Sequence, residues 1–145
     1  MTFTSIAFGL ISGFVGWMLT EFVAKPFRKG IDLIAEARSL SIIYANVQAR
    51  HRETGTDGTG PLAAMDIPQE AEERLQLAER SFREQGARLQ AFAKTDVVAA
   101  KALKLLKVDV EAAGIAFIGL SNNVGIYGKN RNDANTRLTT ALGIL

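Results

Sequence analysis

The chain has 145 residues, which is enough for one domain or for a small domain with an appendage. It is 48% hydrophobic and 22% charged, with a mean hydropathy of +0.10, and this composition excludes a disordered chain. Without cysteine and with one histidine, the chain excludes a disulfide framework and cysteine-ligated metals, and neither a metal nor a cofactor is expected. The net charge of +2 and the even spread of basic and acidic residues argue against nucleic acid as a partner.

The N-terminal segment predicts a transmembrane helix. Residues 1–20 carry no charged side chain. As an α-helix, the 19 residues from Thr2 to Thr20 are roughly 28 Å long, close to the thickness of the hydrocarbon core of a lipid bilayer. Trp17 is expected near the membrane interface, and Lys25, Arg28 and Lys29 follow the segment. This excess of positive charge predicts a single-pass protein with its N-terminus outside and its C-terminal domain in the cytoplasm.

Two other interpretations of this segment fit less well. A cleaved signal peptide needs a basic stretch before its apolar run, and none is present. It also needs a cleavage site with small residues, and no convincing one follows. A buried core helix of a soluble protein is the other alternative, but the length of the segment favours a bilayer.

Small residues recur on one side of the predicted transmembrane helix, at Gly9, Ser12, Gly13 and Gly16. This spacing lets a second membrane helix approach closely, either from another copy or from a partner protein. Glycine is also frequent in membrane helices that make no such contact. We expect a homo-oligomer or a complex with another membrane protein.

The remaining sequence predicts an all-α domain. We expect a membrane anchor over residues 1–25, followed by a four- to five-helix cytoplasmic bundle over residues 26–145. Pro26 is compatible with the start of a new helix or with a bend in a continuing one, and a bend between the two is expected. The expected helices run from Lys25 to about Gln48, from an Asp66 cap to about Lys94, from a Thr95 or Asp96 cap to about Leu106, from an Asp109 cap to about Val124, and from an Asn132 or Asp133 cap to the apolar tail.

Apolar periodicity indicates which helix faces are buried. A heptad-like seam is expected in the core, and residues 112–120 are expected to form the central helix, where Gly114 and Gly119 allow close packing. The apolar C-terminal tail should dock or dimerise. The seam consists of Ala71, Leu75, Ala78, Phe82, Gln85, Leu89 and Phe92, and the tail contains Leu138, Leu142, Ile144 and Leu145.

Lys101, Lys104 and Lys107 form a basic stripe with two interpretations. The stripe either touches acidic lipid headgroups or is the solvated side of a core helix.

Residues 50–66 interrupt the helical pattern and predict a mobile loop. The glycine-rich part, Thr54–Pro61, lacks the Gly-Lys-Ser/Thr ending of a phosphate-binding loop, so nucleotide binding is not expected. His51 has no evident partner and is interpreted as a solvated residue.

Five polar residues lie inside otherwise apolar helical stretches: Arg38, Tyr44, Asn46, Ser121 and Asn122. Buried polar groups require hydrogen-bond partners. These residues predict either an internal network joining two helices or a small polar pocket for a ligand or a partner peptide.

A resemblance to known proteins is carried by the run Glu21–Arg28, by Ala37-Arg38, by Tyr44–Val47 and by Phe117–Asn122. These motifs resemble a group of uncharacterised bacterial single-span membrane proteins with a helical cytoplasmic domain. The resemblance implies an architecture and a place in the bacterial inner membrane, but no activity and no catalytic residues.

The sequence contains no arrangement of side chains typical of a catalytic site, so we do not expect an enzyme. The favoured function is a membrane-anchored scaffold or an accessory subunit of a membrane complex, with the lipid bilayer as a partner. The glycine face and the C-terminal tail would provide its contacts. The alternative is a membrane-tethered sensor or effector whose helical domain binds a ligand, for example in stress or phage defence. An enzyme acting on lipids or phosphates is a weaker third possibility.

Overall fold

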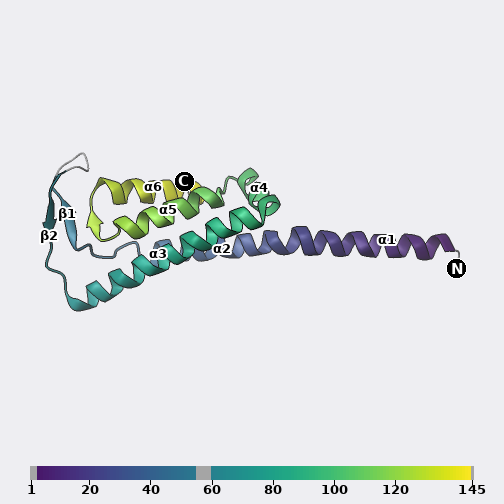
Figure 1. The fold of residues 1–145 in the computed structure, drawn as a ribbon, viewed down its shortest axis with the longest axis horizontal. Coiled ribbons are helices and arrows are strands. Elements are labelled where there is room, and N and C mark those ends of the chain that lie inside the picture. The colour runs from purple at the N-terminus through teal and green to yellow at the C-terminus, as the bar shows by residue number, and fades with distance from the viewer. Residues whose placement is uncertain (1–2, 55–59, 145) are drawn as a thin grey trace.

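A computed structural model describes residues 3–54 and 60–144, and the chain is mostly helical (Figure 1). A long N-terminal helix leaves the packed part of the protein and extends away from it. A small sheet lies at the opposite end of the molecule. In chain order the elements are α1 (Phe3–Leu19), η1 (Thr20–Ala24), α2 (Lys25–Ile43), β1 (His51–Glu53), β2 (Leu62–Ala64), α3 (Gln69–Thr95), α4 (Val97–Leu105), α5 (Val110–Asn123), β3 (Ile126–Tyr127) and α6 (Lys129–Ala141).

The elements α1, η1 and α2 form one continuous helix, and η1 is a single π-helical turn directly before Pro26. Proline has no N–H, and its ring would clash with the carbonyl four residues earlier. The wider π turn relieves this conflict, and the Lys25 N–H bonds to the carbonyl of Thr20. The predicted bend at Pro26 is therefore wrong, because Figure 1 shows the helix passing this point without a sharp bend.

The helices α2 to α6 share one hydrophobic core, in which α5 packs between α3 and α6. The predicted seam on α3 is confirmed: six of its members are buried, and Ala71 is half-buried. Gln85 is the only amide in this seam, and its Nε2 donates to the carbonyl of Leu33 on α2 (2.8 Å). The six buried members are Leu75, Ala78, Phe82, Gln85, Leu89 and Phe92.

The prediction that α5 is the central buried helix is confirmed for only one of its faces. Ala113, Phe117 and Leu120 are buried, but Ile115 is 57% exposed and Asn122 is exposed as well. The helix therefore presents one face to the core and another to the outside of the molecule.

The predicted caps have mixed outcomes. Asp109 caps α5 as expected, since its Oδ1 accepts a hydrogen bond from the N–H of Ala112 (3.0 Å). Asp66 does not cap α3, because Pro68 occupies the N-cap position with an extended ψ of 152°. The helix α2 ends at Ile43 rather than near Gln48, since the residues after it form a turn.

The start of α6 is also earlier than predicted. The helix begins at Lys129, so Asn132 and Asp133 lie inside it and do not cap it. The N–H of Lys129 is bonded instead to Oε2 of Glu53 (2.9 Å), which is far away in the sequence. A carboxylate at a helix N-terminus supplies the same electrostatic benefit as a local cap.

A three-stranded sheet corrects the expectations of an all-α domain and of a loop over residues 50–66. The strand order is β2-β1-β3, in which β1 is antiparallel to β2 and parallel to β3. His51 lies opposite Ala64 on one side and Ile126 on the other. Residues 55–59, in the middle of the predicted loop, lie outside the described part of the chain.

Candidate functional site

The most distinctive surface of the protein is the outside of α1. Within the described residues, the helical stretch Ile6–Ile43 contains a window of mean hydropathy 1.7 that is long and apolar enough to cross a membrane. None of that window is buried against the rest of the described chain, and Phe8 and Leu10 are 75% and 71% exposed. So large an exposed apolar surface indicates contact with a membrane or with other proteins.

The glycine positions on α1 lie open in the single chain. A Cβ atom built on Gly9, Gly13 or Gly16 would meet no other atom within 4 Å. With about 100° of rotation per residue, these glycines and Ser12 share one side of the helix. The backbone is thus accessible along a shallow strip, as the predicted helix–helix contact requires.

The predicted interface residues surround the start of α2. Lys25 Nζ lies 2.6 Å from Oε2 of Glu21, and Lys29 Nζ lies 3.1 Å from Oδ2 of Asp96. The ammonium group of Lys29 also lies 5.6 Å from the centre of the Phe92 ring. Arg28 is exposed.

Trp17 is the predicted interface residue that lies furthest from this group. Its ring centre lies 5.9 Å from that of Phe14 and 6.1 Å from that of Phe22. It precedes Lys25 by about 12 Å along the helix axis.

The five polar residues predicted to form a network or pocket are not brought together. The guanidinium of Arg38 donates to the carbonyl of Leu142 (2.7 Å), and the hydroxyl of Ser121 donates within its own helix to Ile118 (2.8 Å). The ring of Tyr44 packs edge-on against another aromatic ring of the core, while Asn46 and Asn122 are exposed. Within the described residues, no hydrogen bond joins any two of the five.

Of the two expectations for the C-terminal tail, docking is the one that the structure shows for Leu138 and Leu142, and Arg38 contributes to it. Leu138 and Leu142 are fully buried in the core of their own chain, so they are not available to a partner. The left-handed Gly143 (φ 64°) ends α6 in a capped turn, which holds this segment in place. Ile144 is 48% exposed, and Leu145 lies outside the described residues.

Two arginines that the sequence did not single out organise the end of the domain that carries the sheet. Arg50 bonds to Glu72 (Nε to the carboxylate oxygens, 2.9 Å) and to Glu79 (3.1 Å). Arg131 donates to the carbonyls of Val124 and Val47 at 2.9 and 3.0 Å. Their partners come from distant parts of the chain, so the sequence carries no local signal for either cluster.

Within the described residues, no carboxylate lies within ion-pair distance of Arg131. Its guanidinium lies 5.0 Å from the centre of the Tyr127 ring, and burial lowers its pKa against an opposing effect of that tyrosine. A guanidinium nevertheless remains protonated at neutral pH. The residue therefore acts as a permanently charged clamp between α6, β3 and the segment after α2.

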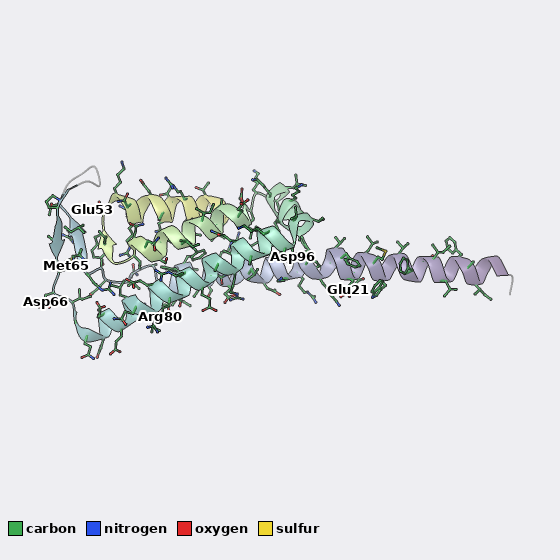
Figure 2. The ribbon with its side chains drawn as sticks, in the orientation of Figure 1. Glu21, Glu53, Met65, Asp66, Arg80 and Asp96 are labelled. Atoms are coloured by element: carbon green, nitrogen blue, oxygen red, sulfur yellow. The ribbon has the colours of Figure 1, made fainter. Side chains whose placement is uncertain are left out.

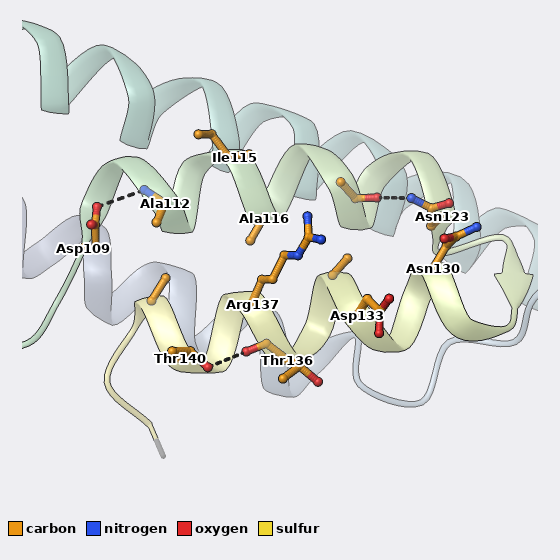
Figure 3. A pocket seen from close by; sticks show the side chains of 13 residues that line it. Asp109, Ala112, Ile115, Ala116, Asn123, Asn130, Asp133, Thr136, Arg137 and Thr140 are labelled. Carbon is orange, nitrogen blue, oxygen red and sulfur yellow. Dashed lines mark hydrogen bonds between the residues drawn. The ribbon is translucent and has the colours of Figure 1, made fainter. Parts of the chain in front are cut away.

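A groove of about 670 Å³ runs between α5 and α6 on the outside of the domain (Figure 3). Its floor consists of small side chains, among them Ala112, Ala116 and Ala134, and Arg137 extends across it from α6. Polar groups lie along its edges at Asp109, Asn123, Asn130, Asp133, Thr136 and Thr140.

The acid at one end of the groove, Asp109, has a fixed charge state. Burial alone would raise the pKa of its carboxyl, but hydrogen bonds from Lys104 Nζ and from the backbone of Ala112 outweigh this effect and lower the pKa. The ion pair with Lys104 measures 2.7 Å. Asp109 is thus a charged capping residue at neutral pH, because these hydrogen bonds outweigh the burial that favours the protonated state of a general acid.

Comparisons with family models, with curated proteins and with solved structures find no match for this chain. The exposed helix, the basic residues at its end and the groove are therefore the features that indicate a function.

Proposed function

We propose that this protein is a non-enzymatic, membrane-anchored scaffold or an accessory subunit of a membrane complex. The observation that supports the proposal most is the exposed apolar surface of α1, which is continuous with a helix of the folded domain. In water, exposed side chains such as those of α1 would cost about 25 cal/mol for each Å² left in contact with solvent. A lipid bilayer removes this cost and accepts a helix of this length.

In this proposal α1 crosses the bacterial inner membrane once and α2 continues into a cytoplasmic helical bundle. The basic residues Lys25, Arg28 and Lys29 then lie on the cytoplasmic side, in agreement with the positive-inside tendency. Because α2 contributes Leu33, Ile34 and other side chains to the core, the anchor and the domain are joined by a helix rather than by a flexible linker. A rigid connection of this kind suits a protein that holds a partner at a fixed height above the membrane.

The glycine face of α1 is the surface through which we expect assembly. With the C-terminal tail buried in its own domain, the strip of Gly9, Ser12, Gly13 and Gly16 is the predicted contact that is still accessible. Close backbone approach along such a strip is a main source of helix association in membranes, where lipid removes the hydrophobic driving force.

The test is the size of the particle that is purified in mild detergent from membranes. The double variant Gly9→Leu/Gly13→Leu should shift a defined oligomer or complex towards the monomer, because leucine side chains separate the backbones. The control is Ala7→Leu, which adds the same bulk on the opposite side of the helix and should leave the particle unchanged. A wild-type protein that is monomeric under these conditions would contradict the proposal.

A second candidate function is ligand sensing, and the groove between α5 and α6 favours it. Its volume of about 670 Å³ lies in the range of small-molecule sites, and it combines an apolar floor with a few polar groups. Arg137 and Asp133 place one charge of each sign in its lining, since Asp109 is paired with Lys104, so a zwitterionic ligand with an apolar body would fit best.

A thermal-shift screen of small zwitterionic metabolites tests this second candidate. A true groove ligand should raise the melting temperature of the wild type and of Arg80→Glu, an exposed arginine on α3 outside the groove, but not of Arg137→Glu. A ligand that stabilises all three proteins equally does not bind in the groove. If no compound in the screen stabilises the wild type, ligand sensing is contradicted and the scaffold function is favoured.

A further inference from the structure

The outer face of α4 is unusually apolar for a helix on the surface of a small domain. Leu105 is 86% exposed, Val98 68%, Leu106 64% and Val97 45%. The buried side of the helix is formed by Ala99 and Leu103, so these exposed residues are not needed for the core. Four apolar side chains at this level of exposure indicate that this face contacts a membrane or another protein.

Lysines lie among these apolar residues. Lys101 falls between Val98 and Leu105 on the helix surface, and Lys104 lies beside it. Lys107 follows directly after the helix and takes a left-handed conformation (φ 64°), as the residue after a helix end often does. Alternation of leucine or valine with long basic side chains is typical of helices that lie in a membrane interface.

The position of α4 brings this face close to the expected membrane surface. α4 closes the end of the domain from which α1 departs (Figure 1), and Figure 2 places Asp96, its N-cap residue, at the same end as Glu21. α4 packs closely against α2, since a Cβ built on Gly30 would lie 2.6 Å from Cδ1 of Leu103. Lys29 at the start of α2 also forms an ion pair with Asp96.

The distances agree with contact between α4 and the headgroups. Gly30 lies six residues after Ala24, which corresponds to about 9 Å along the helix axis. A helix has a radius of about 5 Å, and the headgroup layer on each side of a bilayer is about 5–7 Å thick. If the hydrocarbon core ends between Thr20 and Ala24, the near side of α4 lies about 4–10 Å beyond it, so the side chains of α4 reach the headgroups.

The charge at this end of the domain matches an anionic surface. Three of the basic residues are neutralised by Glu21, Asp96 and Asp109. Among the described residues, no carboxylate lies within ion-pair distance of the three others, Arg28, Lys101 and Lys107. These three basic side chains at the end of the domain that carries α4 are therefore available to an anionic surface.

We infer that α4 is a second membrane contact, which lies in the headgroup layer of an anionic leaflet. Leu105 and Val98 enter the boundary of the acyl chains, while Lys101, Lys107 and Arg28 contact lipid phosphates. Together with α1, this contact fixes the orientation of the domain on the membrane. The inference rests on the proposed anchoring by α1.

The absence of cysteine from the sequence allows a direct test with single labels on the full chain. An environment-sensitive fluorophore is attached to Leu105→Cys, Phe14→Cys or Leu62→Cys in vesicles of phosphatidylcholine and phosphatidylglycerol. The vesicles contain lipids brominated either near the headgroup or deep in the acyl chain. The label at position 105 should be quenched by shallow bromines, and the label at position 14 by deep ones. The label at position 62, exposed on β2 at the far end, should not be quenched.

The outcomes separate the two proposals. Quenching at position 14 without quenching at position 105 overturns the role of α4 and leaves the anchor standing; a protein partner would then be the better occupant of this face. Absence of quenching at positions 14 and 105 overturns the anchor and the inference together. Quenching at position 62 equal to that at position 105 would also overturn the specific role of α4.

Charge variants test the recognition of anionic lipid. Each of the substitutions Lys101→Gln and Lys107→Gln should reduce the ratio of docked to undocked label at position 105 by about fivefold in anionic vesicles. Lys129→Gln, an exposed lysine at the start of α6 at the opposite end of the domain, is the matched control and should have little effect. Equal quenching in pure phosphatidylcholine would show that the contact does not depend on anionic lipid.

Discussion

At the scale of single residues, the pair of Arg50 and Glu72 makes the stability of the folded state depend on pH. The hydrogen bond from Arg50, together with one from Gln76, lowers the pKa of Glu72 below its ordinary value of 4.5. The same hydrogen bond raises the pKa of Arg50. Because the unfolded chain takes up a proton at higher pH than the folded one, this pair contributes stability fully above pH 4.5. The contribution is lost as the pH falls through the lower pKa of the folded state.

We expect Glu72→Gln to remove this pH dependence. The variant should melt below the wild type at neutral pH, because Arg50 loses its main partner, and the difference should shrink as the pH falls below 4.5. Thermal unfolding followed by circular dichroism at a series of pH values measures both curves. Glu84→Gln, at an exposed position of the same helix, serves as the control. A difference that stays constant across the series would contradict the assigned role.

At the scale of elements, the crossing of α3 and α5 depends on two glycines. A Cβ on Gly86 would lie 2.9 Å from the carbonyl oxygen of Gly114, and a Cβ on Gly114 would lie 3.0 Å from the carbonyl oxygen of Gly86. The two backbones are thus in contact at this point, and neither can shift as a flexible side chain could. The sequence predicted close packing at Gly114, and its partner Gly86 became evident only in the structure.

Alanine substitutions test this crossing against intrinsic helix propensity. In a free helix, Gly→Ala stabilises by about 1 kcal/mol. Gly86→Ala and Gly114→Ala should nevertheless lower the melting temperature, because the added methyl group forces the helices apart. Gly119→Ala should be neutral or stabilising, since its Cβ would lie 3.7 Å from Ala134. Stabilisation by all three substitutions would show that the crossing is not tight.

Local patterns predicted the helices but not their long-range partners. The seam of α3 follows from a regular spacing of apolar residues, and the Asp109 cap needs only neighbouring residues, so both are confirmed. The strands contain three residues or fewer and are held by partners such as the His51 N–H bond to Gly125 (3.1 Å), which no local pattern encodes. The predicted network or pocket grouped five residues because they are polar and lie in apolar stretches. Their surroundings depend instead on the helix face that each occupies, and Asn122, for example, lies on the outer face of α5.

At the scale of the whole molecule, the two ends differ in character. Figure 1 shows α1 and α4 at one end and the small sheet at the other. The basic residues at the start of α2 and the lysines of α4 belong to the first end, while the contacts of Arg50 and Arg131 lie beside the sheet. The groove lies between these ends on the side of α5 and α6. This polarity fits a domain that faces a membrane with one end and other molecules with the remainder of its surface.

The most direct test of the central proposal is the extraction of membranes that contain the full chain with alkaline carbonate. This treatment releases proteins that are held at the surface by charge and leaves those that are held by a transmembrane helix. We expect the protein to remain in the membrane pellet, and a variant with Leu10→Lys and Phe14→Lys on α1 to appear in the supernatant, because a charge at the centre of a bilayer is costly. Release of the intact wild-type chain into the supernatant would contradict anchoring by α1.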